Sequence, residues 1–175
     1  MTTDDEARAA FAAFVRAESA AATRFAYLLT GDRHHAEDLV QVALARVAVR
    51  WERIDDPAAY LRRVLYTQAA SWWRWRRARP PESLTDAPPD GAAGRAEDAE
   101  LRLVLRQALA RLTVRQRAVL MLRYYEDRTE TETAVLLGCA VGTVKSQTRH
   151  ALARLRSLAP ELAELVGRPV PEVTR

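Results

Sequence analysis

The stretch ETETAVLLGCAVGTVKSQTR, residues 130–149, decides the fold of the C-terminal half of the chain. In a helix-turn-helix motif, a small residue lies where two helices cross, and a glycine follows four positions later in the turn. Ala134 and Gly138 have this spacing. We therefore predict a helix-turn-helix whose second helix begins near Val141. An ordinary helical hairpin is the alternative that this pattern leaves open.

The second helix of this motif has two chemically different sides. Its predicted buried side carries Val144, Thr148, Ala151, Leu152 and Leu155. Its outer side is small, polar and basic, a combination that suits major-groove base edges and phosphates. This outer side carries the predicted DNA-binding residues Gly142, Thr143, Lys145, Ser146, Arg149 and His150.

Two capping boxes mark further helix starts, one before the motif and one at its first helix. Thr113 with Gln116, and Thr129 with Glu132, have the spacing of a capping box, in which both residues satisfy backbone N–H groups at a helix start. With a helix over 97–111 before them and one over about 141–157 after them, the C-terminal half contains four helices. Helices of this length joined by short turns form a compact domain.

Residues 79–96, RPPESLTDAPPDGAAGRA, separate this domain from the rest of the chain. They contain four of the eight prolines and two of the six glycines, a composition that predicts a flexible linker. The predicted units are therefore 1–78, the linker 79–96, the helical domain 97–158 and a loose tail over 159–175. The fold class is all-α, with two small helical domains.

The N-terminal unit also has the pattern of helices. We predict one over about 7–29 and one over about 33–52, which Asp32 caps after the break at Gly31. Asp56 followed by Pro57 starts a third helix, which continues into SWWRWRR, residues 71–77.

A helical wheel divides the third helix into two faces. Trp72 falls in an apolar arc and is predicted to be a core residue, Trp75 lies at its edge and is ambiguous, and Trp73 falls on a second, basic face. An exposed aromatic ring among arginines suits a nucleic-acid strand with unstacked bases. A helix lying on an anionic membrane is the alternative. This second face carries Arg62, Arg63, Tyr66, Trp73, Arg74 and Arg77.

The charged residues are distributed according to the same division into two helical units and a linker. The chain has 175 residues and a net charge of +4, with basic stretches over 57–79 and 133–160 that contain no acidic residue. Residues 80–100 between them hold six acidic residues and one arginine. Two basic stretches suggest two contacts with one polyanion.

The single cysteine excludes an internal disulfide, and the absence of a signal peptide or membrane span predicts a cytoplasmic protein.

Both halves together resemble an extracytoplasmic-function (ECF) sigma factor of RNA polymerase. LTVRQRAVLMLRYYEDRTETETAVLLGCAVGTVKSQTRHALARLR, residues 112–156, is similar to region 4 of that family. FAYLLTGDRHHAEDLVQVALARV, residues 25–47, is similar to regions 2.1–2.2, and DPAAYLRRVLYTQAASWWRWRR, residues 56–77, to regions 2.3–2.4. The resemblance covers about residues 11–158 and includes the order and spacing of the segments.

The resemblance implies a role for each surface. Asp38, Leu39, Val40 and Gln41 would dock on the clamp helices of the β′ subunit of core RNA polymerase. The Trp73 face, with Thr67, would bind the −10 element of the promoter and hold its opened non-template strand. The Thr143–Arg149 face would enter the −35 major groove. Family members are often inhibited by an anti-sigma factor, a partner that no residue of this sequence indicates.

Five positions depart from the family pattern. Arg128 and Thr133 stand where apolar residues are usual, Ala140 cannot cap the recognition helix, Thr67 replaces a common Asn, and Val42 replaces a common acid. These changes affect the expected strength of −35 binding and the promoter sequence, and they leave the predicted fold intact.

The remaining function classes are less well supported. We predict no enzymatic activity and no cofactor, because no polar cluster typical of catalysis is visible. His34 and Asp38 alone are too few for a metal site, so none is predicted. The alternatives to a sigma factor are a stand-alone helix-turn-helix regulator and a polymerase-binding protein that is defective in promoter opening.

Overall fold

The computed structural model describes residues 3–77 and 96–160, with side chains described for 5–75 and 103–160. Every regular element in these ranges is a helix, which confirms the all-α prediction with two helical domains. The predicted linker, apart from Ala96, lies outside the described residues, as does most of the predicted tail. The side chain of Arg77 also lies outside them.

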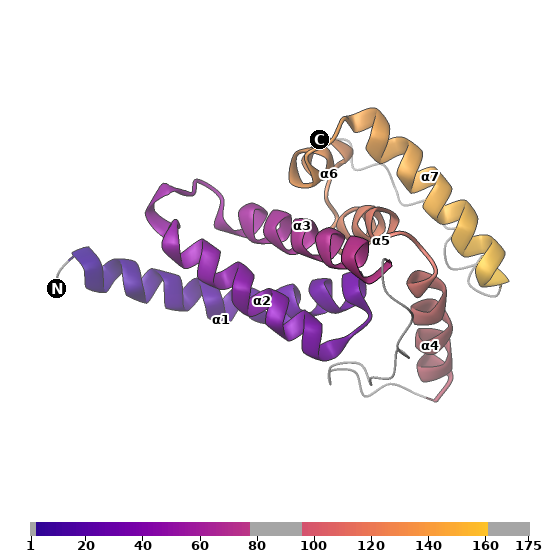
Figure 1. Ribbon diagram of the computed structural model, residues 1–175, viewed down its shortest axis with the longest axis horizontal. Helices are drawn as coiled ribbons and strands as arrows, with labels where there is room; N and C mark the ends of the chain where they lie inside the picture. Colours follow the sequence, from indigo (N-terminus) through magenta and orange to yellow (C-terminus); the bar gives the residue numbers. More distant parts are fainter. Residues whose placement is uncertain (1–2, 78–95, 161–175) are drawn as a thin grey trace.

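The N-terminal domain consists of three long helices. They are α1 (Thr3–Thr30), α2 (Arg33–Val49) and α3 (Pro57–Arg77), with a 3₁₀ turn η1 (Trp51–Arg53) between the second and third. In Figure 1, α2 returns alongside α1, and α3 packs against both.

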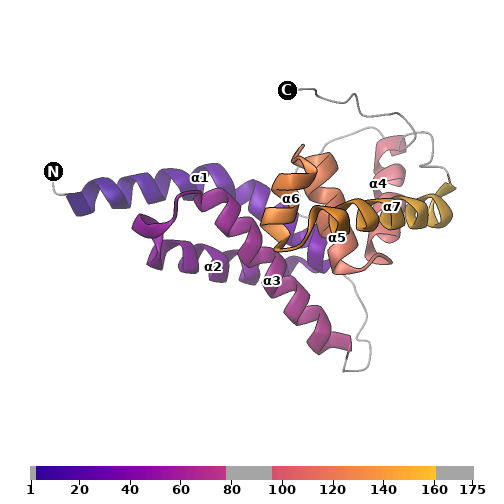
Figure 2. The same cartoon turned by 90° about the horizontal axis from the view of Figure 1, so that it is seen from above.

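The C-terminal domain has four α-helices and one wider turn. They are α4 (Ala96–Ala110), α5 (Val114–Leu120), its π-helical extension η2 (Met121–Tyr125), α6 (Glu130–Leu137) and α7 (Val141–Leu158). Helix α7 contacts α4, α5 and α6 (Figure 1). The view from above shows that α5 and α6 lie beside α3 of the N-terminal domain (Figure 2).

The predicted helix starts are confirmed at atomic level. Asp32, Asp56, Thr113 and Thr129 each accept a hydrogen bond from the N–H three residues further on, at 2.8–3.2 Å. Both predicted capping boxes are complete, because Gln116 and Glu132 return a bond to the capping N–H. These local bonds satisfy donors that a helix start otherwise leaves unpaired.

One predicted helix ends earlier than expected. The helix predicted over 33–52 stops at Val49, and Trp51 begins the separate turn η1. The indole of Trp51 lies 5.2 Å from the ring of Phe11 and 5.2 Å from that of Phe14, centroid to centroid. Packing of this large ring against α1 accounts for the change of direction, since aromatic burial outweighs the small propensity for continuing the helix.

The two domains share one continuous apolar core. Phe25, Leu29, Leu61 and Leu65 of the N-terminal domain belong to the same buried cluster as Val119, Leu122, Leu137 and Val144 of the C-terminal domain. A second cluster consists of buried residues of the C-terminal domain alone, among them Leu109, Leu120 and Leu155. The closed arrangement of the domains, in which they pack directly on one another, was not anticipated from the sequence.

The predicted division between Trp72 and Trp73 is wrong. Trp73 packs against the shared core, and its Nε1–H donates to the carbonyl of Leu29 at 2.9 Å. Trp72 is only partly buried, and its ring stacks on that of His35 at 4.3 Å. The wheel considered only the core of the N-terminal domain, so it missed the C-terminal domain, which covers the side of α3 that holds Trp73. Trp75, left ambiguous, is 54% exposed.

Candidate nucleic-acid interface

The turn between α6 and α7 has the geometry predicted for a helix-turn-helix. Gly138 ends α6 with a positive φ of 62°, a conformation that glycine adopts without the strain of a side chain. Its N–H donates to Val135, and the N–H of Cys139 donates to Ala134. Ala134 is 4% exposed, as expected for the small residue at the helix crossing.

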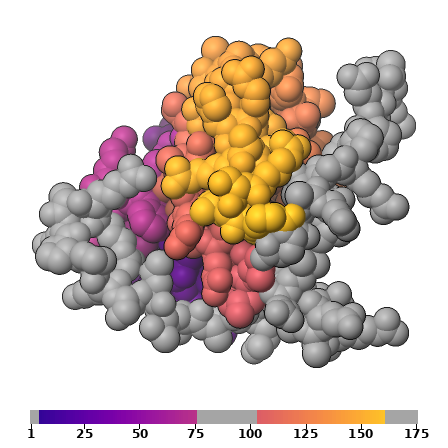
Figure 3. All heavy atoms as spheres, turned by 90° about the vertical axis from the view of Figure 1, so that its right-hand side faces the viewer, coloured from indigo at the N-terminus to yellow at the C-terminus, as the bar shows by residue number. Residues whose placement is uncertain are grey.

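The recognition helix α7 brings the predicted DNA-binding set to one surface. Val144, Ala151 and Leu155 point into the core. Gly142, Lys145, Arg149 and His150 are exposed, and Thr143 and Ser146 are partly exposed. The helix lies at the surface of the C-terminal domain in Figure 3. A helix side of this kind, with small, hydroxyl-bearing and cationic residues, is suited to groove edges and phosphates.

Three residues near this motif depart from the expected family pattern, and they have different surroundings in the structure. Thr133 is fully buried, and its hydroxyl has no hydrogen-bond partner among the described residues. Arg128 remains partly exposed and pairs with Glu132 at 3.6 Å. Hydrogen bonds from Thr129 lower the pKa of that glutamate. Ala140 makes no side-chain cap, as predicted.

The residues of the second predicted interface, on α3, lie in two stripes along the helix, an outer one and an inner one. The outer stripe, Arg63, Thr67 and Arg74, is exposed. The hydroxyl of Thr67 donates to the carbonyl of Arg63 at 3.0 Å. These side chains are free to meet a ligand that approaches from solvent.

The inner stripe of α3, Arg62, Tyr66 and Trp73, faces the C-terminal domain instead. Arg62 Nε donates to Glu126 Oε1 at 2.6 Å, and its Nη2 lies 3.1 Å from Glu18 Oε2. Tyr66 is 7% exposed. In the closed arrangement Arg62 and Tyr66 are therefore buried and Trp73 is partly buried, in contrast to the exposed face that the sequence predicted.

The four predicted polymerase-binding residues of α2 form an exposed pair and a buried pair. Asp38 and Gln41 are exposed, whereas Leu39 and Val40 are 5% and 6% exposed and pack in the core. On the exposed side, Val42 and Val49 follow at helical spacing and are 43% and 86% exposed. Apolar side chains grouped on a helix surface suit contact with another protein.

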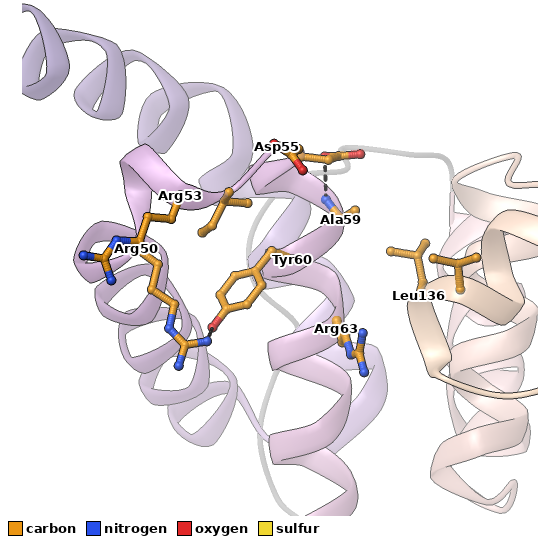
Figure 4. Close-up of a pocket in the computed structure, with 10 residues that line it drawn as sticks. Arg50, Arg53, Asp55, Ala59, Tyr60, Arg63 and Leu136 are labelled. Carbon is orange, nitrogen blue, oxygen red and sulfur yellow. Dashed lines mark hydrogen bonds between the residues drawn. The ribbon is translucent and has the colours of Figure 1, made fainter.

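A cleft of about 600 Å³ lies between the start of α3 and helix α6. Figure 4 shows Tyr60 of α3 pointing toward Arg50, and Arg63 on the side of α3 that is nearer Leu136 of α6. Arg50 Nη1 donates to the hydroxyl of Tyr60 at 3.0 Å. The lining combines arginines, two aspartates and apolar side chains, so it suits a peptide segment better than a small anionic ligand.

Comparison with known proteins identifies the family. Residues 14–79 match the family described as sigma-70 region 2, and residues 102–155 match sigma-70, region 4. The RNA polymerase sigma-E factor of Streptomyces coelicolor is 42% identical over 90% of this chain and 87% of its own length. The ECF RNA polymerase sigma factor SigL of Mycobacterium tuberculosis is 35% identical over 89% of this chain and 94% of its own.

The chain belongs to the ECF RNA polymerase sigma factors. A solved structure of the sigma factor RpoE, in complex with the anti-sigma factor NepR from Bartonella quintana, has the same fold. It superposes with a TM-score of 0.70 and 25% identity, over 86% of this chain and 96% of that one. The protein is therefore a sigma factor that acts in transcription initiation.

The described part of this sigma factor contains no helix that is long and apolar enough to cross a membrane. The alternative interpretation of SWWRWRR as a membrane-surface helix relied on an exposed Trp73, and this side chain is partly buried against the shared core.

Sequence reasoning missed the partners of the inner stripe. Arg115 Nε donates to the hydroxyl of Tyr66 at 3.2 Å, a bond that raises the pKa of Arg115. The guanidinium of Arg117 lies 4.9 Å from the centre of the Trp73 ring. Arg62 and Glu126 are 64 positions apart, and no periodicity or motif connects residues at such a separation.

Proposed function

We propose that this sigma factor binds core RNA polymerase through α2, reads the −35 element through α7 and holds the opened −10 strand through α3. The observation that carries the proposal is the outer side of α7. All six predicted DNA-binding residues lie on one accessible surface of a helix-turn-helix, as an element entering the major groove requires.

On α7, Lys145 and Arg149 would supply charge to phosphates or guanine edges. The side chain of Lys145 is 64% exposed, so it remains accessible to DNA. Its Nζ lies 3.6 Å from Oε2 of Glu130, at the start of α6. Gly142 has no neighbouring atom within 4 Å of an added side chain, which leaves room for DNA to approach the backbone closely. Thr143, Ser146 and His150 would complete the base-reading surface.

On α2, the exposed stripe is the proposed docking surface for the β′ clamp helices. Asp38 and Gln41 would make polar contacts, and the neighbouring Val42 and Val49 would bury apolar area. Leu39 and Val40 would act indirectly by fixing the helix in the core. Val42 thus replaces the acid common in the family with an apolar contact rather than removing the interface.

On α3, residues of both stripes would contact the opened −10 strand. Arg63, Thr67 and Arg74 would contact the phosphates and bases from the outer side, and Arg77 remains part of the predicted set. Arg62, Tyr66 and Trp73 would add stacking and charge once the C-terminal domain no longer covers them. Aromatic and guanidinium planes are suited to unstacked bases because every base has a π-face.

A protein inhibitor is a further part of the proposal. The related RpoE was solved with an anti-sigma factor, and the cleft between α3 and α6 joins both domains of this chain through residues of mixed polarity. An affinity pull-down with the tagged chain from its own host should recover such a partner. Recovery of polymerase subunits alone would count against it.

The first test mixes the purified chain with bacterial core polymerase, separates complexes by gel filtration and then measures run-off transcription on genomic fragments. We expect co-elution and new, defined start sites. Co-elution without initiation would indicate a polymerase-binding protein that is defective in promoter opening. DNA binding without co-elution would indicate a stand-alone regulator.

Two arginines of α7 provide a matched comparison for the −35 assignment. Arg149→Ala removes a charge from the outer side, while Arg154→Ala removes the same charge from an exposed position one turn beyond His150, past the end of the assigned surface. We expect Arg149→Ala to lower promoter affinity by about tenfold or more and Arg154→Ala to have little effect. Equal effects of the two variants would contradict the assigned reading face.

A further inference from the structure

A glutamate of the first helix of the motif lies against a lysine of the recognition helix. Glu130 is the first residue of α6, and its Oε2 lies 3.6 Å from Nζ of Lys145 on α7. The glutamate side chain is 35% exposed and the lysine side chain 64% exposed, so the pair lies at the surface. Because α7 contains no acidic residue of its own, a carboxylate beside its outer side has to come from another element. Glu130 supplies one.

The position of Glu130 is fixed by the start of α6. Thr129 caps this helix and Glu132 completes the capping box, which holds the first turn in one conformation. The carboxylate of Glu132 is used inside that turn, since it accepts from the N–H and the hydroxyl of Thr129, each at 2.7 Å. The two acidic residues of the turn thus have different partners. Glu132 stabilises α6, whereas Glu130 reaches across to α7.

A second charge directs Lys145 the same way. Arg149 lies four residues further along α7, and like charges at this spacing repel each other. Among the described residues, Arg149 forms no ion pair that would offset its charge. Repulsion from Arg149 and attraction by Glu130 both favour a lysine side chain that points toward the start of α7. Residues near the start of a recognition helix are the ones that contact base edges.

A lysine without such a neighbour reads sequence poorly. Its ammonium is a compact, strongly hydrated charge on a flexible stem, so it can neutralise any phosphate within reach. Phosphate contacts carry no sequence information, whereas contacts with base edges do. An ammonium has three donors. Lys145 can give one to Glu130 and keep two for adjacent acceptors in the major groove, such as N7 and O6 of a guanine.

We propose that Glu130 is a positioning residue that determines the specificity of the −35 interface. Its carboxylate holds the Lys145 ammonium at the base edges and offsets the charge that would otherwise attract phosphates. Glu130 therefore lowers affinity for DNA of any sequence and raises discrimination at the base pair that Lys145 reads. The pair contributes little to folding, because exposed ion pairs are screened by water and salt. This inference rests on the proposed −35 role of α7.

The test uses holoenzyme assembled from core polymerase and the full-length chain. The DNA probes are the promoter fragment found by run-off transcription, its single-base variants in the −35 element, and a fragment without a promoter. Glu130→Gln removes the carboxylate charge and keeps the shape of the side chain. Asp127→Asn is the matched control, because it removes the same charge from an exposed position just before α6. Asparagine also tolerates the positive φ of 49° at this position.

We expect Glu130→Gln to lower the ratio of promoter affinity to variant affinity about tenfold at one −35 base pair and to leave the other base pairs unchanged. Binding to the fragment without a promoter should become tighter, and the slope of log affinity against log salt should steepen by about one. Asp127→Asn should keep the original ratios. Urea unfolding midpoints establish that both variants fold like the unaltered chain. Equal ratios in Glu130→Gln and Asp127→Asn would overturn the inference.

A double variant separates positioning from direct contact. Lys145→Gln alone should lower the ratio at the same base pair about as much as Glu130→Gln does. Combining the two changes should cause no further loss, because Glu130 then has no ammonium to position. A further loss in the double variant would give Glu130 a DNA contact of its own and would overturn the positioning role. Absence of core binding or of promoter selection by the unaltered chain would instead contradict the proposed function.

Discussion

At the scale of single residues, Thr133 shows a local cost within the helix-turn-helix. Its hydroxyl is fully buried without a hydrogen-bond partner among the described residues. The family resemblance leads us to expect an apolar β-branched residue at this position. An unpaired buried hydroxyl costs about 1–3 kcal/mol relative to a satisfied or apolar group.

Thr133→Val should therefore stabilise the protein by about 1 kcal/mol, because valine keeps the shape and removes the unpaired hydroxyl. Urea unfolding followed by circular dichroism measures the change. Thr30→Val is the matched control, since the equally buried hydroxyl of Thr30 donates to the carbonyl of Ala26 at 2.9 Å. The control should lose about 1 kcal/mol. A loss of stability in both variants would contradict the unpaired state of Thr133.

At the scale of elements, the turn between α6 and α7 depends on one backbone conformation. Gly138 has a φ of 62°, while Gly142 lies inside α7 with no atom near an added side chain. The positive φ lets Gly138 reverse the chain within a few residues, which fixes the angle at which α7 leaves α6. Substitution by alanine is therefore expected to change the stability of the domain in opposite directions at the two glycines.

Gly138→Ala should destabilise the C-terminal domain by about 1–2 kcal/mol, because a side chain strains the left-handed conformation. Gly142→Ala should stabilise it by about 0.5–1 kcal/mol, since alanine loses less entropy in a helix. Denaturation midpoints of the two variants, with unchanged slopes, measure both effects. Equal shifts in the same direction would be incompatible with this backbone geometry.

At the scale of the whole molecule, the shared core links the stability of the two domains. Leu122 is fully buried in the cluster that both domains form, whereas Leu155 lies in the cluster whose buried members all belong to the C-terminal domain. Local unfolding is expected to follow such clusters of buried contacts.

Leu122→Ala should lower stability by about 2–5 kcal/mol, and it should reduce amide hydrogen-exchange protection in α3 as well as in α5 and α7. Leu155→Ala should reduce protection in α4, α5 and α7 and leave α2 close to its original protection. If Leu122→Ala leaves α3 fully protected, the shared core does not couple the two domains.

Local interactions made much of this architecture predictable. The caps at Asp32, Asp56, Thr113 and Thr129, the turn at Gly138 and the two sides of α7 all depend on residues within a few positions of one another. Their hydrogen bonds and helical spacing are therefore visible in the order of the residues. The family resemblance depends on the same order and spacing, and it identified the sigma factor correctly.

The sequence alone determined the helices, their caps, the exposed polar side of α7 and the family. Only the tertiary structure decided which stripe of α3 faces solvent, because that depends on a second domain packing against it. The Trp73 assignment failed for this reason: its partner Arg117 lies on α5, beyond the linker. A helical wheel reports the polarity of a face, whereas burial of that face depends on contacts between residues far apart in the chain.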